Sequence, residues 1–362
     1  MSIWNALASL FSRSDDDSLS IPPLDGPLKP NNRLDEAERI VDLPSADNLV
    51  AVENGFLCSG GDTLYRIDPN GGCVIPIRRF EHPITALAAS PAGIIAVGIE
   101  REGVLVDAGG AWTPHDLGNA NGCITSLGFR GETELLVTIG SHRHPWSDWK
   151  RDLMSHGKTG AVLSLDLAAS TAPRVLSNGL AFPYGLALSP NGEILVAESW
   201  KHRLVAIAAA SGARLEARLE ELPAYPARLA PAASGGYWLA CFAPRRQLTE
   251  MILREDDYRA EMMATIPPSS WIGPDFADHL NDDQPLQSGS VRQMGILKPW
   301  APSRSYGLVL RLNAALHAVA SYHSRADGAI HGVTSIAERG SFVYAAARGT
   351  GAVLRFPVEN RS

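Results

Sequence analysis

The chain has 362 residues, of which 20% are charged and 45% hydrophobic, as in a globular protein with a large core. A formal net charge of −7 argues against a nucleic-acid-binding surface, because no basic stripe is present to neutralise phosphates. The 33 glycines and 25 prolines are typical of a chain with many short strands and tight turns.

The N-terminal segment has a pattern of its own. Apolar side chains recur there at helical spacing, at Trp4, Leu7, Leu10 and Phe11. The apolar run is too short to span a bilayer, and it lacks the basic start and the cleavage site of a signal peptide. We expect residues 1–40 to form an N-terminal arm of a cytoplasmic protein, and contact of this arm with a membrane surface is the alternative.

From residue 41 onward, one phrase recurs six times: an apolar strand, a turn rich in Gly, Pro, Asn or Ser, and a second apolar strand. It is clearest in residues 84–106 and 182–207. The six copies begin near Asp47, Ile84, Ile124, Phe182, Pro226 and Val333. A repeat of about forty residues is typical of one four-stranded blade. The sequence therefore predicts an all-β fold, a six-bladed β-propeller over residues 41–362.

Two long insertions interrupt the repeats, at about residues 141–159 and 242–305. Insertions in repeat proteins become loops, often on the binding face, so both are expected to cover the central channel like lids. Within the second insertion, residues 254–261 mix acidic and basic side chains. This run predicts a charged helical face rather than a pair of catalytic carboxylates.

The four cysteines are scattered along the chain without C-x-x-C spacing, at Cys58, Cys73, Cys123 and Cys241. Two disulfides are compatible with this number. Free cysteine is among the most buried residue types, and no secretion signal is recognised in the sequence. Four buried free thiols are therefore the favoured prediction.

Five phrases resemble the strictosidine-synthase-like six-bladed propellers, the branch that includes the adipocyte plasma membrane-associated proteins, with gluconolactonases and paraoxonases more distant. They occupy residues 26–40, 178–190, 195–199, 222–226 and 234–238. The resemblance covers most of the chain from residue 26 and implies a hydrolase or condensing enzyme working at the channel mouth. Metal-dependent members hold calcium there with Glu, Asn and Asp oxygens, and the ion polarises an ester or lactone carbonyl.

This chain departs from the family pattern at the metal-holding positions. The resemblance places those positions at Asn48 (Asp47 if the register shifts by one), Thr125, Ser126, Tyr184, Ala227 and Arg228. Threonine, tyrosine, alanine and arginine do not supply the oxygen ligands that calcium requires at such a site. We therefore expect no metal and no other cofactor.

Plant strictosidine synthases work without the metal and use a Glu of the sixth blade. The resemblance places Thr334 at that position, with Glu338 in an expected loop after it. A threonine cannot relay the proton that a carboxylate handles. Strictosidine formation itself is therefore not expected.

The resemblance also places seven hydrogen-bonding side chains around the channel mouth, and together they form a ring. They are Asp47, Asn48, Thr85, Thr125, Tyr184, Arg228 and Thr334. Such a ring, which contains one cation, suits an anionic or polyhydroxylated small ligand. In the alternative, Arg228 pairs with Asp47 across the channel and plugs it, because buried charges are usually paired.

Histidines supply a second set of candidates. They are His142, His144 and His156 in the first insertion, and His331 just before the last inner strand. A His-x-His pair can bind zinc or provide a general base. The tryptophans and basic residues of the same insertion favour a solvated amphipathic lid instead, and no known zinc spacing is matched.

Two functions remain open. The resemblance and the lid favour a metal-independent hydrolase-like enzyme acting on an ester, lactone or related small molecule, with His142, His144 or His331 as the candidate base. The replaced metal and catalytic positions favour instead a non-catalytic propeller that binds a ligand or another protein.

Overall fold

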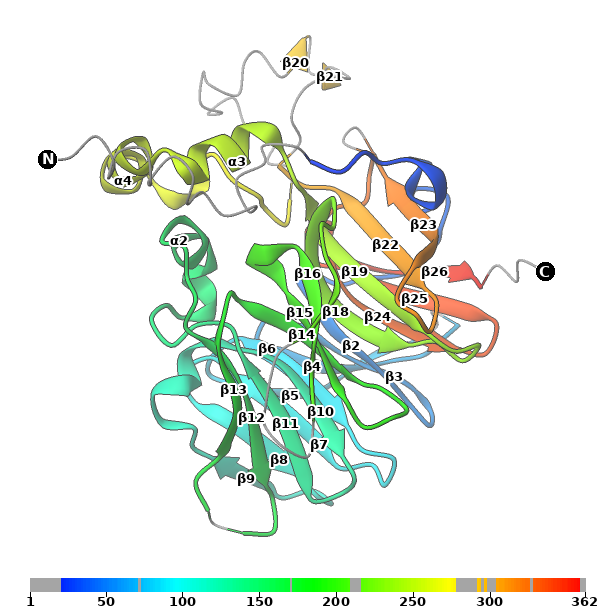
Figure 1. Cartoon of the computed structure of the whole chain (residues 1–362). Helices are drawn as coiled ribbons and strands as arrows, with labels where there is room; N and C mark the ends of the chain where they lie inside the picture. The colour runs from blue at the N-terminus through cyan, green and yellow to red at the C-terminus, as the bar shows by residue number, and fades with distance from the viewer. Residues whose placement is uncertain are drawn as a thin grey trace, which may run out of the picture.

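The computed structural model describes residues 21–70, 73–169, 171–208, 216–277, 292–293, 296–297, 304–325 and 328–358. Within them, six four-stranded antiparallel sheets form a ring, so the predicted six-bladed β-propeller is confirmed (Figure 1). The helix expected within residues 1–12 lies outside the described residues.

The first three blades follow the chain order of their strands. Blade 1 consists of β2 (Ala46–Val52), β3 (Gly55–Gly60), β4 (Thr63–Ile67) and β5 (Val74–Arg79). Blade 2 consists of β6 (Ile84–Ala89), β7 (Ile95–Ile99), β8 (Gly103–Asp107) and β9 (Trp112–His115). Blade 3 consists of β10 (Ile124–Arg130), β11 (Glu134–Ile139), β12 (Gly160–Asp166) and β13 (Arg174–Leu180).

The last three blades include the strand that closes the ring. Blade 4 consists of β14 (Pro183–Leu188), β15 (Ile194–Glu198), β16 (Arg203–Ile207) and β17 (Glu216–Leu219). Blade 5 consists of β18 (Ala224–Pro231), β19 (Tyr237–Pro244), β22 (Gly307–Leu312) and β23 (Ala318–Ser324). Blade 6 consists of β24 (Val333–Arg339), β25 (Phe342–Ala347), β26 (Ala352–Pro357) and β1 (Glu38–Asp42).

Strand β1 pairs with β26 and so joins the two ends of the ring. The Glu38 carboxylate lies 2.6 Å from an Arg355 nitrogen across this pair. β1 therefore begins within the residues that the sequence assigned to the N-terminal arm. Just before it, Leu34 is fully buried, and Asp35 Oδ1 accepts a hydrogen bond from Ser324 Oγ of β23 at 2.6 Å. This part of the arm packs against blade 5.

The inner strands surround the channel, because β2, β6, β10, β14, β18 and β24 each contact the next, and β24 contacts β2. Sandwiched between neighbouring sheets, an inner strand such as β6 is almost wholly buried, whereas the outer strand β5 is mostly exposed. Two inner strands approach each other closely at Gly185. A Cβ there would lie 2.4 Å from the carbonyl oxygen of Ala227, so only glycine lets β14 approach β18 this closely.

Both insertions place helices on the same side of the ring (Figure 1). The first holds η4 (Trp146–Asp148) and α2 (Trp149–Met154). The second holds α3 (Gln247–Arg254), α4 (Asp256–Thr265), η6 (Pro268–Ser270) and the short strands β20 (Arg292–Gln293) and β21 (Ile296–Leu297). Further short 3-10 helices are η2 (Gly26–Leu28), η3 (Gly118–Cys123) and η5 (Ser199–Lys201). The predicted helix in the charged run is confirmed as α4.

No helix in the described part of the chain combines the length and the apolar character that a membrane crossing requires. All four cysteines are free thiols, as expected, and Cys58, Cys123 and Cys241 are buried. The prediction is wrong for Cys73, which is exposed because it lies just before β5, an outer strand that faces solvent.

Candidate functional site

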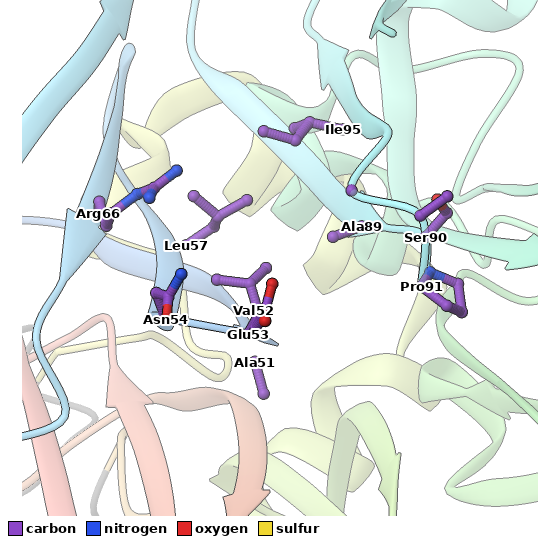
Figure 2. Close-up of a pocket in the computed structure, with 12 residues that line it drawn as sticks. Ala51, Val52, Glu53, Asn54, Leu57, Arg66, Ala89, Ser90, Pro91 and Ile95 are labelled. Atoms are coloured by element: carbon purple, nitrogen blue, oxygen red, sulfur yellow. The ribbon is translucent and has the colours of Figure 1, made fainter. Parts of the chain in front are cut away.

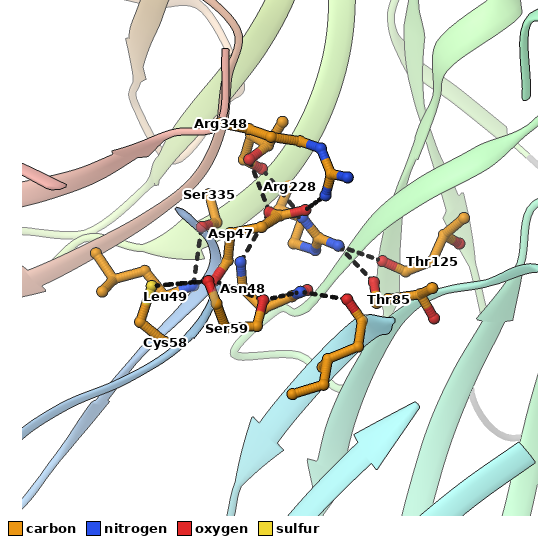
Figure 3. A network of polar contacts seen from close by, with 12 residues as sticks. Asp47, Asn48, Leu49, Cys58, Ser59, Thr85, Thr125, Arg228, Ser335 and Arg348 are labelled. Carbon is orange, nitrogen blue, oxygen red and sulfur yellow. Dashed lines mark hydrogen bonds and ion pairs between the residues drawn. The ribbon is translucent and has the colours of Figure 1, made fainter. Parts of the chain in front are cut away.

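Arg228 extends from β18 into the centre of the channel, where its guanidinium group binds several blades at once (Figure 3). Its Nη1 lies 2.6 Å from Asp47 Oδ1 of blade 1. Its Nη2 donates to the carbonyl oxygens of Thr85 in blade 2, at 2.8 Å, and Thr125 in blade 3, at 2.9 Å. The guanidinium group of Arg228, a residue of blade 5, therefore binds to blades 1, 2 and 3.

The two remaining blades contact the same guanidinium group. Nη1 lies 3.5 Å from the carbonyl oxygen of Thr334 in blade 6. The guanidinium carbon lies 5.0 Å from the ring centre of Tyr184 in blade 4, within the range of a cation–π interaction. One side chain from blade 5 therefore contacts every other blade of the ring.

Asp47 is the principal counter-ion, and it is fully buried. Thr334 Oγ1 donates to Asp47 Oδ1 at 2.7 Å, and Arg348 Nη1 lies 3.1 Å from Asp47 Oδ2. Burial by itself would raise the pKa of Asp47, but Arg228 and Arg348 hold that pKa below its usual range. The channel mouth therefore contains one carboxylate held between two guanidinium groups.

The other ring residues bond within the protein. Asn48, which has a left-handed φ of 55°, donates from Nδ2 to Ser59 Oγ at 2.8 Å. Thr85 Oγ1 donates to the carbonyl oxygen of Gly98, and Thr125 Oγ1 to that of Pro183. The structure thus brings all seven predicted residues together, but as the plug of the alternative prediction rather than as an open ring.

This arrangement does not fit a divalent ion, because a guanidinium group already lies among the oxygen atoms that face the channel axis. Asp47 is the one carboxylate among the seven ring residues, whereas calcium sites use several oxygen ligands with enough negative charge to balance the ion. In the described part of the chain, no group of three or more His, Cys, Asp or Glu side chains is placed to hold a metal ion.

An aromatic layer covers the plug and joins it to the lid. The Arg348 guanidinium carbon lies 4.2 Å from the ring centre of Trp146 and 5.1 Å from that of Phe276. Successive ring contacts then link Trp146, Phe276, Trp149, Phe242, Tyr184, Phe182, Trp200 and Tyr225. These rings come from both insertions and from blades 4 and 5, so the lid shields the channel mouth.

The predicted histidines do not form one site. His142 is exposed, and His144 Nδ1 lies 3.8 Å from Asp148 Oδ2 in the first insertion. His331 belongs to blade 6, where its Nε2 lies 2.9 Å from the carbonyl oxygen of Gly328. His142 and His144 both belong to the lid of blade 3, so the zinc or general-base interpretation of this pair stays a prediction, whereas His331 lies apart from them in blade 6. Glu338 also differs from expectation, since it belongs to β24 and not to a loop.

A different histidine forms the buried acid–base pair on the lid side of the ring. His202 follows η5, and its Nε2 lies 3.5 Å from Glu250 Oε1 of α3. Arg245 Nη2 lies 3.3 Å from the second oxygen of Glu250. The edge of the His202 ring packs against Tyr225, with ring centres 4.4 Å apart. Blade 4 thus supplies the imidazole, and the second insertion supplies the carboxylate.

The ionisation of this pair is set by burial and by its neighbours. Burial lowers the pKa of His202 below its usual 6.5, and the nearby Arg245 acts in the same direction. Burial would raise the pKa of Glu250, but contacts with His202 and Arg245 outweigh this effect and lower it to about 2. At neutral pH the pair therefore consists of a neutral imidazole and a carboxylate.

A pocket of about 280 Å³ opens beside this pair, and both insertions and the η5 loop line it. Its lining includes Leu153, Lys158, Trp200, His202, Arg245 and Glu250. Three buried polar atoms of its lining residues, His202 Nδ1, Glu250 Oε1 and Arg245 Nε, have no hydrogen-bond partner. Buried polar groups are usually paired, so these atoms mark a place where a bound molecule or water would be stabilised.

A larger pocket of about 490 Å³ lies between the turns of blades 1 and 2, where inner strands end (Figure 2). Its side chains include Leu57, Ile95, Glu53 and Arg66, and both charged residues are exposed. None of its lining residues forms a buried acid–base pair. The pocket beside His202 is therefore the better candidate for chemistry.

Comparison with known proteins agrees with the fold and the resemblance. The family model described as strictosidine synthase matches residues 129–207. Adipocyte plasma membrane-associated protein of Danio rerio is 26% identical over 261 residues, and that of Salmo salar is 26% identical over 262 residues. Each match covers 63% of this chain and 61% of the relative. The chain is a six-bladed β-propeller that resembles the strictosidine-synthase family.

Solved structures share this propeller at low sequence identity. A gluconolactonase from Xanthomonas campestris superposes with a TM-score of 0.57 and 11% identity, covering 90% of this chain and 91% of that one. A calcium-binding regucalcin from Agrobacterium tumefaciens superposes with a TM-score of 0.56 and 12% identity, covering 88% and 92%. Similarity at this level establishes the fold alone.

Replacing Arg228 with methionine is expected to lower the free energy of unfolding by about 3 kcal/mol or more, because Asp47 would lose its closest partner while remaining buried. Chemical denaturation measures this change. The matched control is Arg66→Met, which removes an exposed arginine and is expected to cost less than about 0.5 kcal/mol. Equal effects of the two substitutions would contradict a stabilising role for the plug.

Calcium and chelators are expected to leave the melting temperature of the propeller unchanged, because Arg228 already supplies a cation to the oxygens at the channel mouth. A ligand that binds the native state raises the melting temperature as its concentration increases. Thermal unfolding in EDTA and across a calcium series tests this. A concentration-dependent rise in calcium would show that the channel mouth accepts the ion after all.

Proposed function

We propose that this propeller is a metal-independent hydrolase-like enzyme that acts on an ester, lactone or related small molecule in the pocket beside His202. One observation carries the proposal: a buried imidazole–carboxylate pair, His202 and Glu250, borders a pocket on the lid side of the ring. A neutral histidine oriented by a carboxylate is a general base for activating water.

The reaction proceeds in two steps, and His202 accepts a proton in the first and returns it in the second. His202 takes a proton from water while the water oxygen bonds to the carbonyl carbon, and the Glu250 carboxylate stabilises the imidazolium that forms. The tetrahedral intermediate then expels the alkoxide, which takes the proton back from His202. The products are an acid and an alcohol, or a single hydroxy acid when the substrate is a lactone.

The names of the relatives do not fix the class of reaction. The Xanthomonas campestris neighbour is named a gluconolactonase, but its 11% identity supports only a shared scaffold. The curated relatives are named for association with the plasma membrane, and this chain aligns with 61% of their length. For this chain a cytoplasmic location remains our proposal, with membrane contact through the N-terminal arm as the alternative.

A second candidate function is a non-catalytic propeller that binds a small molecule. The observation that favours it is the plug, because Arg228 and Asp47 fill the place where related propellers hold a catalytic metal. Under this alternative, compounds that enter the pocket raise the melting temperature of the protein but are recovered unchanged. Parallel thermal-shift and turnover measurements on the same compounds separate the two functions.

His202→Gln is expected to reduce turnover of aryl acetates and lactones by about 10²-fold to 10⁴-fold, the usual contribution of a general base. Full-length protein is assayed in the presence of EDTA, and circular dichroism verifies folding. His142→Gln is the matched control, since that side chain is exposed in the lid and lies outside the pocket lining. No turnover by the unmodified protein would refute hydrolase activity, whereas equal rates for both variants would refute only the role of His202.

The pH dependence of kcat/KM is expected to show an acid limb below pH 6.5, because burial lowers the pKa of His202 and the base must be unprotonated. Activity is full above that folded-state pKa and is lost as the pH falls through it. Glu250→Gln removes the carboxylate that opposes this lowering, so the limb moves to still lower pH while the maximal rate falls. A limb that stays in place in Glu250→Gln would exclude His202 as the titrating base.

A further inference from the structure

The pocket of about 490 Å³ between blades 1 and 2 plays no part in the proposed hydrolysis, because it lies at the end of the ring opposite to the lid. Strand β2 shows this separation along its own length. Asp47, near the start of β2, pairs with Arg228 at the channel mouth, whereas Glu53, directly after the end of β2, lines the pocket. A molecule bound in this pocket would therefore not contact His202.

The middle of this pocket is apolar. Figure 2 shows the Leu57 side chain between Arg66 on one side and the turn that contains Ser90 and Pro91 on the other. Leu57 is buried and Ile95 is half-buried, so both present part of their surface to the space between the blades. A concave surface with an apolar centre is stabilised when it covers apolar groups of a ligand.

One charged group of each sign borders these apolar side chains. Glu53 belongs to the turn between β2 and β3, and Arg66 lies on β4 directly opposite Leu57 of β3. Both side chains are exposed. In the described part of the chain, neither the Glu53 carboxylate nor the Arg66 guanidinium group forms an ion pair or a hydrogen bond. Both charged groups are therefore available to a ligand.

A second pocket at the same end of the ring differs in this respect. It has a volume of about 390 Å³, lies between blades 4 and 5, and is lined by Glu193 and Arg218 among others. There Arg218 Nη2 lies 2.6 Å from Glu193 Oε1, so the two charges neutralise each other. The pocket between blades 1 and 2 thus differs from it by having a carboxylate and a guanidinium group that are not paired.

We propose that the pocket between blades 1 and 2 binds a short peptide of two or three residues with apolar side chains and free termini. Arg66 binds the terminal carboxylate, Glu53 binds the terminal ammonium group, and Leu57 and Ile95 pack against the apolar side chains. An extended peptide of this length separates its two charges by about 7–10 Å, so it can reach two groups that do not pair with each other. The pocket volume lies within the range of small-molecule sites.

The binding test titrates the full-length protein by calorimetry with Leu-Ala-Leu, its N-acetylated form, its C-terminal amide and Gly-Gly-Gly. Leu-Ala-Leu is expected to bind most tightly. Each blocked form removes one ion pair and is expected to bind about threefold to fivefold more weakly at low salt, which is the contribution of one exposed pair. Gly-Gly-Gly keeps both charges but lacks the apolar side chains, so it is expected to bind about tenfold more weakly or worse.

Two variants assign each terminus of the peptide to its partner. Glu53→Gln is expected to bind Leu-Ala-Leu and its N-acetylated form equally, while it still prefers the free carboxylate to the amide. Arg66→Gln is expected to show the reverse pattern. Glu132→Gln and Arg325→Gln, which change exposed residues outside the pocket lining, are the charge-matched controls and should keep both preferences. All four residues are exposed, so the melting temperatures should change little.

The possible results separate clearly. Failure of every peptide to bind overturns the site. Equal binding of the free and blocked forms overturns recognition of the termini and leaves an apolar groove that accepts an internal peptide segment. Preferences that survive in both Glu53→Gln and Arg66→Gln place the peptide elsewhere on the protein and overturn the assignment as well. The hydrolase proposal is independent of all these results, because it concerns esters in the pocket beside His202.

Discussion

Closing six blades into a ring directs backbone carbonyl oxygens toward the axis, and those oxygens require a donor or a cation. Here the guanidinium group of Arg228 meets the carbonyl groups of Thr85, Thr125 and Thr334 and the carboxylate of Asp47. A buried charge is stable only when it is paired and hydrogen-bonded, and each partner of Arg228 comes from a different blade. The pairing of this one charge therefore connects blade 5 with blades 1, 2, 3 and 6 at the channel mouth.

The cation at the channel mouth is the side chain of Arg228, and a side chain cannot bind a substrate oxygen as a metal ion does. A metal ion keeps positions open for a substrate oxygen, whereas the donors of Arg228 are directed at Asp47 and at backbone carbonyl groups. Arg348, stacked against Trp146, occupies the other side of Asp47. The open pocket that a substrate needs therefore lies beside the plug, where the lid meets blade 4, and not within it.

The sequence predicts the features that depend on local pattern. The repeat phrase sets the starts of all six inner strands, and through them it places Asp47 and Arg228 at the channel mouth, with their pairing foreseen as an alternative. The pair formed by His202 and Glu250 leaves no such pattern, because the two residues are far apart in the chain and meet only where α3 folds back over η5. The insertions lie outside the six repeats. Their contacts depend on tertiary packing and therefore cannot be predicted from the repeat pattern of the sequence.

The plug and the pocket are joined by a continuous series of aromatic contacts. The guanidinium group of Arg228 lies over Tyr184, whose ring contacts Phe242 at 5.8 Å; Phe242 contacts Tyr225 at 5.7 Å, and Tyr225 contacts His202. Closely packed rings have few alternative positions, so the site of the first ring restricts the site of the last. Arg228 therefore fixes one end of the aromatic layer against which the imidazole of His202 packs.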